Sequence, residues 1–444
     1  MLVLWTDALI YLLVLTALGM SLYASRQPHI RRPLNKLAAS PVAMASLCLL
    51  LCFTAVGLID SIHFKNTASN ANEAISLLDQ FCETQRTQVE KTYSAPFAAY
   101  LYSKESIVQA DGASRWDYPR LKYGAAHLQN PDTELFADVL VKAGFALAKS
   151  LGLMVLLVLG VIRINPQRYW TNSSAKAVWS VISMVWVLGY CLWALSHDYH
   201  VFGTDKVGED VFYQALKSIR TGLVIGTLTT LVMLPMGIVF GIMAGFFKGW
   251  VDDVIQFVYT TLNSIPSVLL IAASILMVQV YMANHADQFN NLLVRADMRL
   301  LFLCLILGVT SWTGLCRLLR AETLKLREME YVLAAQSLGV RPHLILLRHI
   351  LPNVMHIVLI SVVLDFSSLV LAEAVLSYIN IGVDPTTHSW GNMINGARLE
   401  MAREPVVWWS LAAAFVFMFG LVLAANLFAD QVRDAFDPRR AEHG

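Results

Sequence analysis

Long apolar runs recur along the chain, and polar segments separate them. A helix needs about 20 apolar residues to cross the roughly 30 Å hydrocarbon core of a bilayer. The pattern therefore predicts nine membrane-spanning helices, at residues 2–24, 41–60, 143–163, 177–196, 220–247, 254–282, 299–320, 353–378 and 406–428. The run at 143–163 is the weakest of these, because Lys149 lies in its first half. We expect an all-α, polytopic membrane protein.

The composition agrees with this pattern. Hydrophobic residues make up 57% of the 444 residues and charged residues only 15%, where soluble domains carry about 25%. The formal net charge of +1 gives no reason to expect nucleic-acid binding. The six cysteines form no CxxC pair and no HExxH occurs, so we expect no disulfide framework and no metal site. A soluble enzyme, a disordered scaffold and a secreted disulfide-rich domain are excluded.

Lysine and arginine in short loops predict the orientation, because such loops stay on the cytoplasmic side. Three basic segments carry the signal: Arg26, Arg31, Arg32 and Lys36; then Arg163, Arg168 and Lys176; then the six Lys and Arg residues of 317–352. All three lie on one side if nine spans alternate. The N-terminus is then periplasmic and the C-terminus cytoplasmic. No Lys or Arg precedes the first apolar run, so we expect a retained span rather than a cleaved signal.

The polar segments divide the chain into six parts. These are two spans with a basic loop at 1–60, a hydrophilic periplasmic block at 61–142, two further spans at 143–196, a segment at 197–219 that precedes the fifth span, a five-helix core at 220–430 that includes loop 321–352, and a cytoplasmic tail at 431–444. Within the hydrophilic block we expect 71–91 to be helical and 111–134 to be irregular.

Loop 321–352 mixes polar and apolar residues at helical spacing, so it should be helical yet lie outside the lipid. We expect a short helix at 331–338, with Gly339 just after its end, where a left-handed backbone is least costly. Pro342 should then open a second short helix, and Pro352 the next span.

The paired Ala334 and Ala335 give this helix–glycine–helix arrangement a compact surface that a partner's groove can approach closely. The alternative is an ordinary amphipathic loop that rests on the lipid headgroups. Periodicity alone does not decide between them.

The stretch that leads into the fifth span is amphipathic. Its apolar face holds Val207, Val211, Phe212, Ala215, Leu216 and Ile219, and Lys206, Glu209, Asp210 and Lys217 lie largely opposite. This pattern predicts an interfacial helix on the outer membrane surface.

Polar residues inside the spans are candidates for a solute path. Asp365 and Glu373 are eight residues apart, so they share one helix face. Asn263 and Ser264 precede Pro266, which should kink the sixth span. The alternative for each of these residues is a structural contact between helices.

Several ordered motifs together resemble one family. Ala334-Ala335, Gly339 and then Ile350-Leu351-Pro352 resemble the "EAA…G…LP" loop of ABC-importer permeases. The segment with Gly203, Thr204, Asp205, Gly208 and Asp210 resembles the GTDxxGRD signature of the C-type subunit of the dipeptide, oligopeptide and nickel branch. Leu376-Ser377-Tyr378, Trp390-Gly391 and the stretch 433–438 resemble its later motifs. The likeness covers about residues 197–440.

The resemblance implies a type I ABC importer permease core in the C-terminal half, in the bacterial inner membrane. The loop with Tyr331 at its start would be the coupling helix that docks into an ATPase subunit. The GTD segment would lie near the docking place of a periplasmic solute-binding protein. A homologous second permease and two ATPases would complete the complex. No GxxxxGK motif occurs, so ATP and Mg²⁺ would be bound by those ATPases and this chain would have no catalytic residues.

Three features depart from the family pattern. Leu333 stands where the loop has Glu, and Glu209 where the GTD signature has Arg. Four spans precede the GTD segment, where the family usually has one.

Two other functions remain open from the residues. An ion-coupled carrier could use Asp365 and Glu373, although nine spans give no even inverted repeat. A non-transporting assembly or sensor protein could bind a ligand with block 61–142. Peptides, antimicrobial peptides and nickel complexes all fit the resemblance as solutes.

Overall fold

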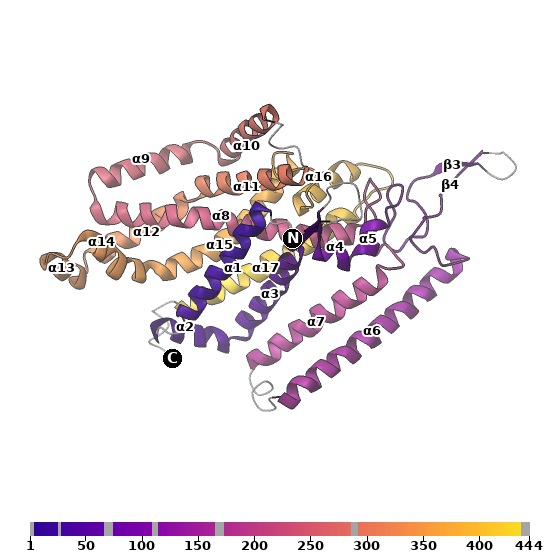
Figure 1. Ribbon diagram of the computed structural model, residues 1–444, viewed down its shortest axis with the longest axis horizontal. Helices are drawn as coiled ribbons and strands as arrows, with labels where there is room; N and C mark the ends of the chain where they lie inside the picture. The colour runs from indigo at the N-terminus through magenta and orange to yellow at the C-terminus, as the bar shows by residue number, and fades with distance from the viewer. Residues whose placement is uncertain are drawn as a thin grey trace. The chain divides into compact units, whose positions relative to one another are not determined.

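The computed structural model describes residues 4–24, 28–65, 74–108, 114–164, 173–285 and 292–436 (Figure 1). Arg26 and Arg168 of the basic loops, and the tail after Phe436, lie outside these ranges. Strands in the described ranges are limited to two antiparallel pairs, β1 (His63–Lys65) with β2 (Ala74–Ser76) and β3 (Glu105–Val108) with β4 (Ser114–Asp117). All other regular structure is helical, which confirms the predicted fold class.

The chain divides into two compact units. The first contains residues 38–221 and 388–424, and the second contains 3–37, 222–387 and 425–444. Two long helices contribute to both, α8 (Val211–Phe247) and α17 (Trp409–Phe436). The predicted segments 61–142, 143–196 and 197–219 all fall within the first unit.

The first unit contains three long helices, α3 (Pro41–Asp60), α6 (Pro131–Ile164) and α7 (Ser173–Leu195). Helix α7 packs against both α3 and α6, as Figure 1 shows. The short helices α4 (Leu77–Phe81) and α5 (Glu83–Thr87) and the helix α16 (Trp390–Glu400) complete it. Ser76 and Asp79 form a reciprocal capping box that begins α4.

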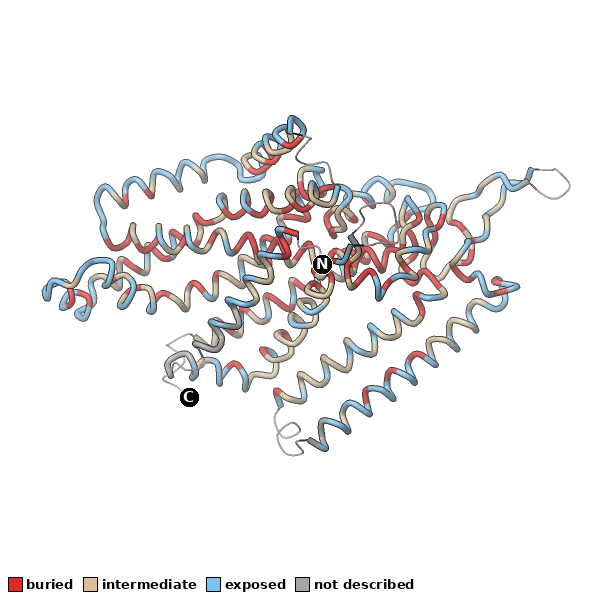
Figure 2. Tube along the Cα trace, in the orientation of Figure 1, coloured by how far each residue is buried: buried red, intermediate tan, exposed pale blue. Residues whose placement is uncertain are grey.

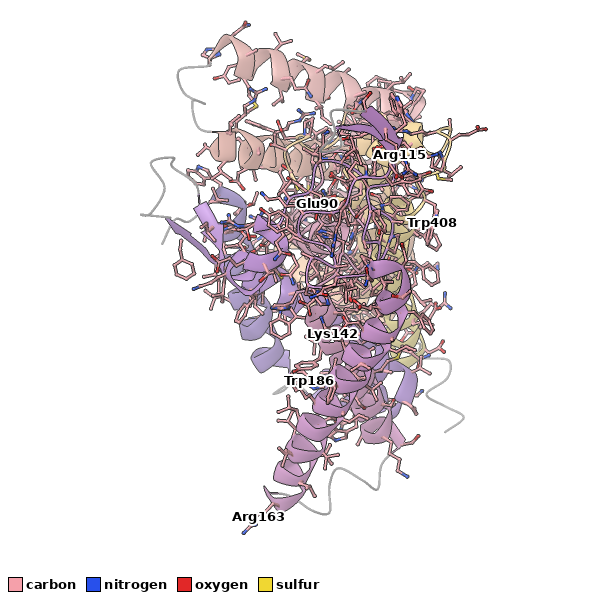
Figure 3. The ribbon with its side chains drawn as sticks, turned by 90° about the vertical axis from the view of Figure 1, so that its right-hand side faces the viewer. Glu90, Arg115, Lys142, Arg163, Trp186 and Trp408 are labelled. Carbon is pink, nitrogen blue, oxygen red and sulfur yellow. The ribbon has the colours of Figure 1, made fainter. Side chains whose placement is uncertain are left out.

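Helix α6 begins 12 residues before the predicted span at 143–163. Its 34 residues make it about 50 Å long, which exceeds the bilayer core. Asp132 and Glu134 lie in its first turn, where negative charge stabilises a helix. Lys142 and Arg163 lie at either side of its apolar stretch (Figure 3).

The hydrophilic block differs from its prediction. The expected helix at 71–91 is replaced by β2, α4 and α5, and residues 71–73 lie outside the described ranges. The expected irregular stretch at 111–134 contains β4 and the start of α6. In the described part of the block, the helices before α6 are five residues long each, and polar side chains such as Glu90 and Asp79 bond to distant segments.

The second unit contains α1 (Trp5–Ala24), α2 (Pro28–Ala39) and the helices from α9 to α15. These are α9 (Trp250–Ser264), α10 (Ser267–Asn284), α11 (Leu292–Ser311), α12 (Thr313–Arg327), α13 (Glu330–Ser337), α14 (Pro342–Ile345) and α15 (Leu351–Tyr378). One hydrophobic core joins α8, α10, α11 and α15 through buried residues that include Ile225, Leu228, Ile275, Leu300, Leu303, Leu307 and Leu376.

Glycine lets helices of the second unit approach closely. A Cβ at Gly226 would lie 2.4 Å from the Phe366 ring, and one at Gly308 would lie 2.6 Å from Val232. Close backbone approach at small residues is typical of helices that pack within membranes.

Seven helices in the described residues are long and apolar enough to cross a membrane. The nine spans predicted from the sequence are therefore an approximate number. The seven helices are residues 41–60, 131–160, 173–195, 211–247, 267–284, 342–378 and 409–436. The predicted span at 2–24 contains a shorter apolar helix, Trp5–Thr16. The one at 299–320 divides between α11 and α12, and three charged residues lie within α11.

The predicted span at 254–282 is broken rather than kinked. Helix α9 ends at Ser264, Ile265 is extended, and α10 begins at Ser267 after Pro266. The residue before a proline is pushed out of the helical region, which explains the full break.

Candidate functional site

Loop 321–352 folds as the predicted helix–glycine–helix. Helix α13 ends at Ser337, and Gly339 lies just beyond its C-cap with a φ of +74°, the left-handed conformation that glycine adopts at least cost. The Val340 N–H donates to the Ala335 carbonyl (3.1 Å) and the Gly339 N–H to the Gln336 carbonyl (2.9 Å). These two bonds form a Schellman motif, so the end of α13 is fixed by its own backbone.

The second half of the loop leads directly into α15. Pro342 occupies the first turn of α14, as predicted. A π-helical turn, Leu346–Ile350, then joins α14 to α15, and the Leu351 N–H bonds to the Leu346 carbonyl. Pro352 has no N–H to donate in the turn that follows, which favours this wider turn.

The two faces of α13 have different environments. Val332 and Ala335 are buried in a core with Ile345 and Ile350. Ala334 is exposed on the opposite side, and Tyr331 is partly exposed. Of the predicted pair, Ala335 therefore supports the fold and Ala334 is free to meet a partner.

The loop that carries Ala334 also presents several exposed apolar side chains. Leu338 is 83% exposed, and Met329, Tyr331, Leu333 and Leu347 are each more than 40% exposed. The outer side of α13 and α14 is correspondingly pale blue in Figure 2. Several exposed apolar side chains in one short loop indicate a contact with a protein or with lipid.

Polar contacts hold the loop against the rest of the second unit. The Tyr331 hydroxyl accepts from the Asn353 side chain (3.1 Å), and the Arg327 guanidinium donates to the Phe246 carbonyl (2.7 Å). Arg320 donates to both carboxylate oxygens of Asp252, at 2.6 and 2.7 Å. This hydrogen bond lowers the pKa of Asp252, so the pair stays ionised.

The GTD segment forms a tight turn in the first unit. The Asp205 carbonyl accepts from the Gly208 N–H (3.0 Å), and its carboxylate accepts from the N–H groups of Val207 and Glu209. Gly208 has a φ of +85°, and a Cβ there would lie 1.9 Å from the Glu90 carbonyl oxygen. Only glycine leaves room for the backbone of Glu90 to come this close.

Gly203 and Thr204 connect the turn to the hydrophilic block in the same way. A Cβ at Gly203 would lie 2.4 Å from the Ser94 carbonyl oxygen. The Thr204 hydroxyl donates to the Thr92 carbonyl (2.8 Å) and accepts from the Ser94 N–H (2.7 Å). Its carbonyl accepts from the Trp409 indole N–H at 2.9 Å. The GTD residues thus join the block to α17.

Asp210 connects the start of α8 to a buried ion cluster. One of its oxygens caps the helix by accepting from the Tyr213 N–H (3.1 Å), and the other bonds to His200 Nδ1 (2.8 Å). His200 Nε2 lies 3.5 Å from a carboxylate oxygen of Glu90. All three side chains are buried. Figure 3 labels Glu90 among the loops of the block.

Burial and charge oppose each other in this cluster. Burial would lower the pKa of His200, but Asp210 and Glu90 outweigh it and raise that pKa to about 9. Burial would raise the pKa of Glu90, yet His200 and the N–H groups of residues 122–124 lower it to about 2. A charged imidazole therefore lies between two carboxylates at neutral pH.

Sequence reasoning missed Glu90, His200 and Trp409. Glu90 and His200 are 110 residues apart, and no local pattern marks either of them. The one signal in the sequence was that His200 lies three residues before Gly203. A histidine beside a turn can bond to the acidic residues of that turn.

The predicted interfacial helix is not a separate helix. Residues 207–210 lie in the turn, and α8 begins at Val211 and continues to Phe247 without a break. Val211, Phe212, Ala215 and Ile219 are buried within the protein rather than laid on lipid. The opposite face is covered too, because Lys217 pairs with Asp79 (2.6 Å) and Asp60 (3.3 Å).

The three solute-path candidates lie in the second unit. Glu373 is 1% exposed and accepts from the Ser377 hydroxyl (2.6 Å). Asp365 is half-buried, and no group among the described residues donates a hydrogen bond to its carboxylate. Ser264 is exposed, and its hydroxyl donates to the Thr261 carbonyl of its own helix. Within the described residues no hydrogen bond joins Ser264 to either carboxylate.

Metal ligands are not gathered anywhere in the part of the chain that the structure describes: no group of three or more His, Cys, Asp or Glu side chains could hold an ion there.

Comparison with known proteins identifies the family. Residues 237–442, from α8 to beyond α17, match the family described as binding-protein-dependent transport system inner membrane component. The dipeptide transport system permease protein DppC of Lactococcus lactis is 31% identical over 55% of this chain and 65% of its own length. The oligopeptide permease OppC of Bacillus subtilis is 29% identical over 54% and 72%. The glutathione permease GsiD of Pectobacterium atrosepticum is 31% identical over 54% and 73%. The chain belongs to this family.

Membership of this family shows what kind of protein the chain is. The chain is a multi-pass inner-membrane permease component, and its family works with ATPase and solute-binding partners. It is a transport subunit rather than a catalytic one. The family does not favour the ion-coupled carrier. The match begins at residue 237, so block 61–142 and helices α6 and α7 lie outside it.

Proposed function

We propose that this chain is the permease subunit of an ABC importer for dipeptides or oligopeptides. In this proposal it pairs with a second, homologous permease, two ATPases that bind ATP and Mg²⁺, and a periplasmic solute-binding protein. The relatives named for dipeptide, oligopeptide and glutathione transport support the solute class. Their sequences align with just over half of this chain.

The proposal places loop 321–352 in the cytoplasm, with the C-terminus. Block 61–142, the GTD segment and the N-terminus then face the periplasm. The distribution of Lys and Arg supports this orientation, since the basic residues of 317–352 fall in one short segment between spans.

The observation that carries the proposal is the division of α13 into two faces. Its exposed face offers Ala334 to a groove, and its buried face packs Val332 and Ala335 against α8, α12 and α15. A partner that moves α13 must therefore move these helices with it as a rigid group. ATP-driven closure of the ATPases would reach the membrane helices by this route.

Reconstitution tests the proposal directly. Liposomes that contain the complete complex should accumulate a dipeptide only with ATP on the ATPase side and the solute-binding protein on the other. The purified chain alone should accumulate nothing, because its energy would come from another polypeptide. Accumulation by the lone chain, or transport driven by a proton gradient without ATP, would contradict the proposal.

Asp365, Glu373 and Ser264 are the candidates for a solute path. Of the three, Asp365 has a carboxylate that accepts no hydrogen bond from the described residues and can therefore bind a solute. Replacement of Asp365 by Asn should reduce dipeptide transport about tenfold, the effect of one lost charge-assisted contact to the solute. ATPase association should stay unchanged. Asp253→Asn, at an exposed carboxylate of α9, serves as the matched control. Normal transport by Asp365→Asn would remove this residue from the path.

A further inference from the structure

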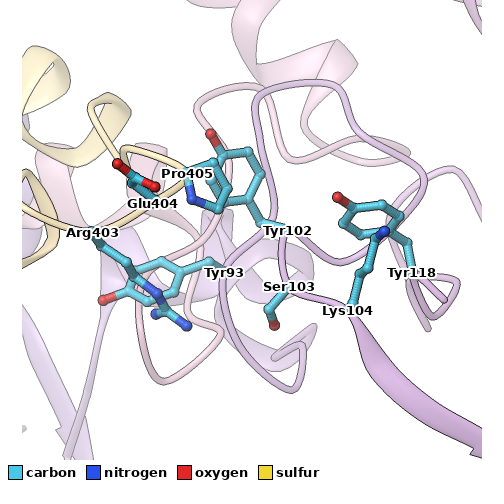
Figure 4. Close-up of a pocket in the computed structure, with 8 residues that line it drawn as sticks. All are labelled: Tyr93, Tyr102, Ser103, Lys104, Tyr118, Arg403, Glu404 and Pro405. Carbon is cyan, nitrogen blue, oxygen red and sulfur yellow. The ribbon is translucent and has the colours of Figure 1, made fainter. Parts of the chain in front are cut away.

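A small pocket opens in the first unit between block 61–142 and the turn that follows α16 (Figure 4). Its volume is about 240 Å³. Six of the residues that line it define its chemistry: Tyr93, Tyr102, Tyr118, Pro405, Lys104 and Arg403. None of them belongs to the loop, the GTD motif or the solute-path candidates.

The two cations of the pocket differ in their partners. The Arg403 guanidinium lies 5.6 Å from the centre of the Tyr93 ring and 3.3 Å from the Glu400 carboxylate. The Lys104 ammonium lies 5.3 Å from the centre of the Tyr118 ring. Among the described residues no carboxylate forms an ion pair with Lys104. One end of the pocket therefore holds a positive charge that no carboxylate of the described residues neutralises.

The negative charge at the pocket lies away from this end. Glu404 also lines the pocket, but its carboxylate is on the far side of Pro405 and Tyr102 from Lys104 in Figure 4. Its field therefore acts only weakly on an anion placed at Lys104.

The tyrosine rings favour an anionic ligand with an apolar group over a cationic one. Tyr93 and Tyr118 already hold protein cations at their rings, so a ligand cation would compete with Arg403 and Lys104. The wall between them is fixed, because the Tyr102 hydroxyl donates to the Val406 carbonyl (3.0 Å) and its ring contacts Trp409.

The volume limits the ligand to one residue. An apolar cavity of about 150 Å³ can hold benzene. The larger volume here holds one aromatic ring together with an adjoining carboxylate. In a peptide these two groups are adjacent only at the C-terminal residue, or where an acidic side chain neighbours an aromatic one.

We propose that this pocket binds the C-terminal residue of a free peptide. The terminal carboxylate lies against Lys104, and an aromatic or prolyl side chain packs between the tyrosine rings and Pro405. The peptide class rests on the proposed function, and the position makes the pocket a recognition site of the permease itself.

Binding to the full-length chain in lipid nanodiscs tests this assignment by calorimetry. The probes are Gly-Phe and its C-terminal amide. Gly-Phe should bind about tenfold more tightly, since charge-assisted contacts to a carboxylate are stronger than contacts to a neutral amide. Lys104→Gln should reduce this preference to about twofold or less. Its side chain is exposed, so the variant should unfold at the temperature of the wild type.

Lys122→Gln provides the matched control. The Lys122 ammonium also lies over a tyrosine ring, 4.7 Å from the centre of Tyr123, but it does not line the pocket. This variant should retain the full preference for Gly-Phe. Equal binding of acid and amide by the wild type, an unchanged preference in Lys104→Gln, or no binding at all would each overturn the assignment.

The assay separates this inference from the proposed function, because it needs no ATPase. If the assembled complex transports dipeptides and the pocket binds none, only the pocket assignment fails. If the pocket binds Gly-Phe and the complex transports no peptide, the proposed transport function fails.

Discussion

An arginine in place of Ala334 is expected to abolish association with the ATPase subunits. Ala334 lies on the exposed face of α13, within a surface of apolar side chains that includes Leu338 and Leu333. A groove that receives this surface must approach the helix backbone closely, and a long charged side chain would hold it away. Loss of a central interface contact costs about 2–4 kcal/mol, which corresponds to a loss in affinity of roughly 30-fold or more. Co-purification of the ATPases from detergent-solubilised membranes measures this loss.

Two variants make the result specific. Ala321→Arg introduces the same side chain at an exposed position of α12 and should leave the complex intact. Gly339→Pro acts through the backbone, because proline cannot adopt the φ of +74° and cannot donate the hydrogen bond that Gly339 makes to Gln336. It should also abolish co-purification. An intact, transporting complex with Ala334→Arg would show that the ATPases bind elsewhere.

Local signals allowed the fold of loop 321–352 to be predicted from the sequence. Gly339, Pro342 and Pro352 each restrict the backbone at their own position, and the structure places a helix end or a helix start at each. The sequence did not show which alanine of the pair faces outward. That depends on packing against Ile345 and Ile350, which only the folded loop defines.

Contacts between distant segments explain the main errors. The amphipathic stretch after the GTD motif suggested a helix on the membrane surface. In the protein its apolar face is buried, and Lys217 on the other face is neutralised by Asp60 and Asp79. Helix α6 likewise extends beyond its apolar run, and Lys142 in this extension bonds to Asp198 at 2.7 Å. These three aspartates lie far from their lysine partners in the sequence, so hydropathy alone could not reveal the contacts.

The buried cluster of His200, Asp210 and Glu90 should make the stability of the first unit depend on pH. The pKa of His200 is raised from 6.5 to about 9 in the folded protein, so its stabilisation is complete below pH 6.5 and is lost as pH rises towards 9. The pKa of Glu90 is lowered from 4.5 to about 2, so its stabilisation is complete above pH 4.5 and is lost as pH falls towards 2. We expect the highest melting temperature between about pH 5 and 6.5.

Removal of the imidazole charge should be strongly destabilising. His200→Gln leaves the buried carboxylates of Asp210 and Glu90 without a cation, and breaking a buried ion pair costs about 3–5 kcal/mol. Thermal unfolding followed by tryptophan fluorescence measures both the loss and its pH dependence, since Trp409 bonds to Thr204 beside the cluster. The variant should also lose the decline in melting temperature between pH 6.5 and 9.

His127→Gln is the matched control for this experiment. His127 also pairs with a carboxylate, Asp138 at 2.8 Å, but its side chain is about one third exposed. Solvent screens such a pair, so this variant should keep the melting temperature and the pH profile of the wild type. If His200→Gln retained the decline above pH 6.5, the titrating group would be another residue, and His200 would be neutral in the folded protein.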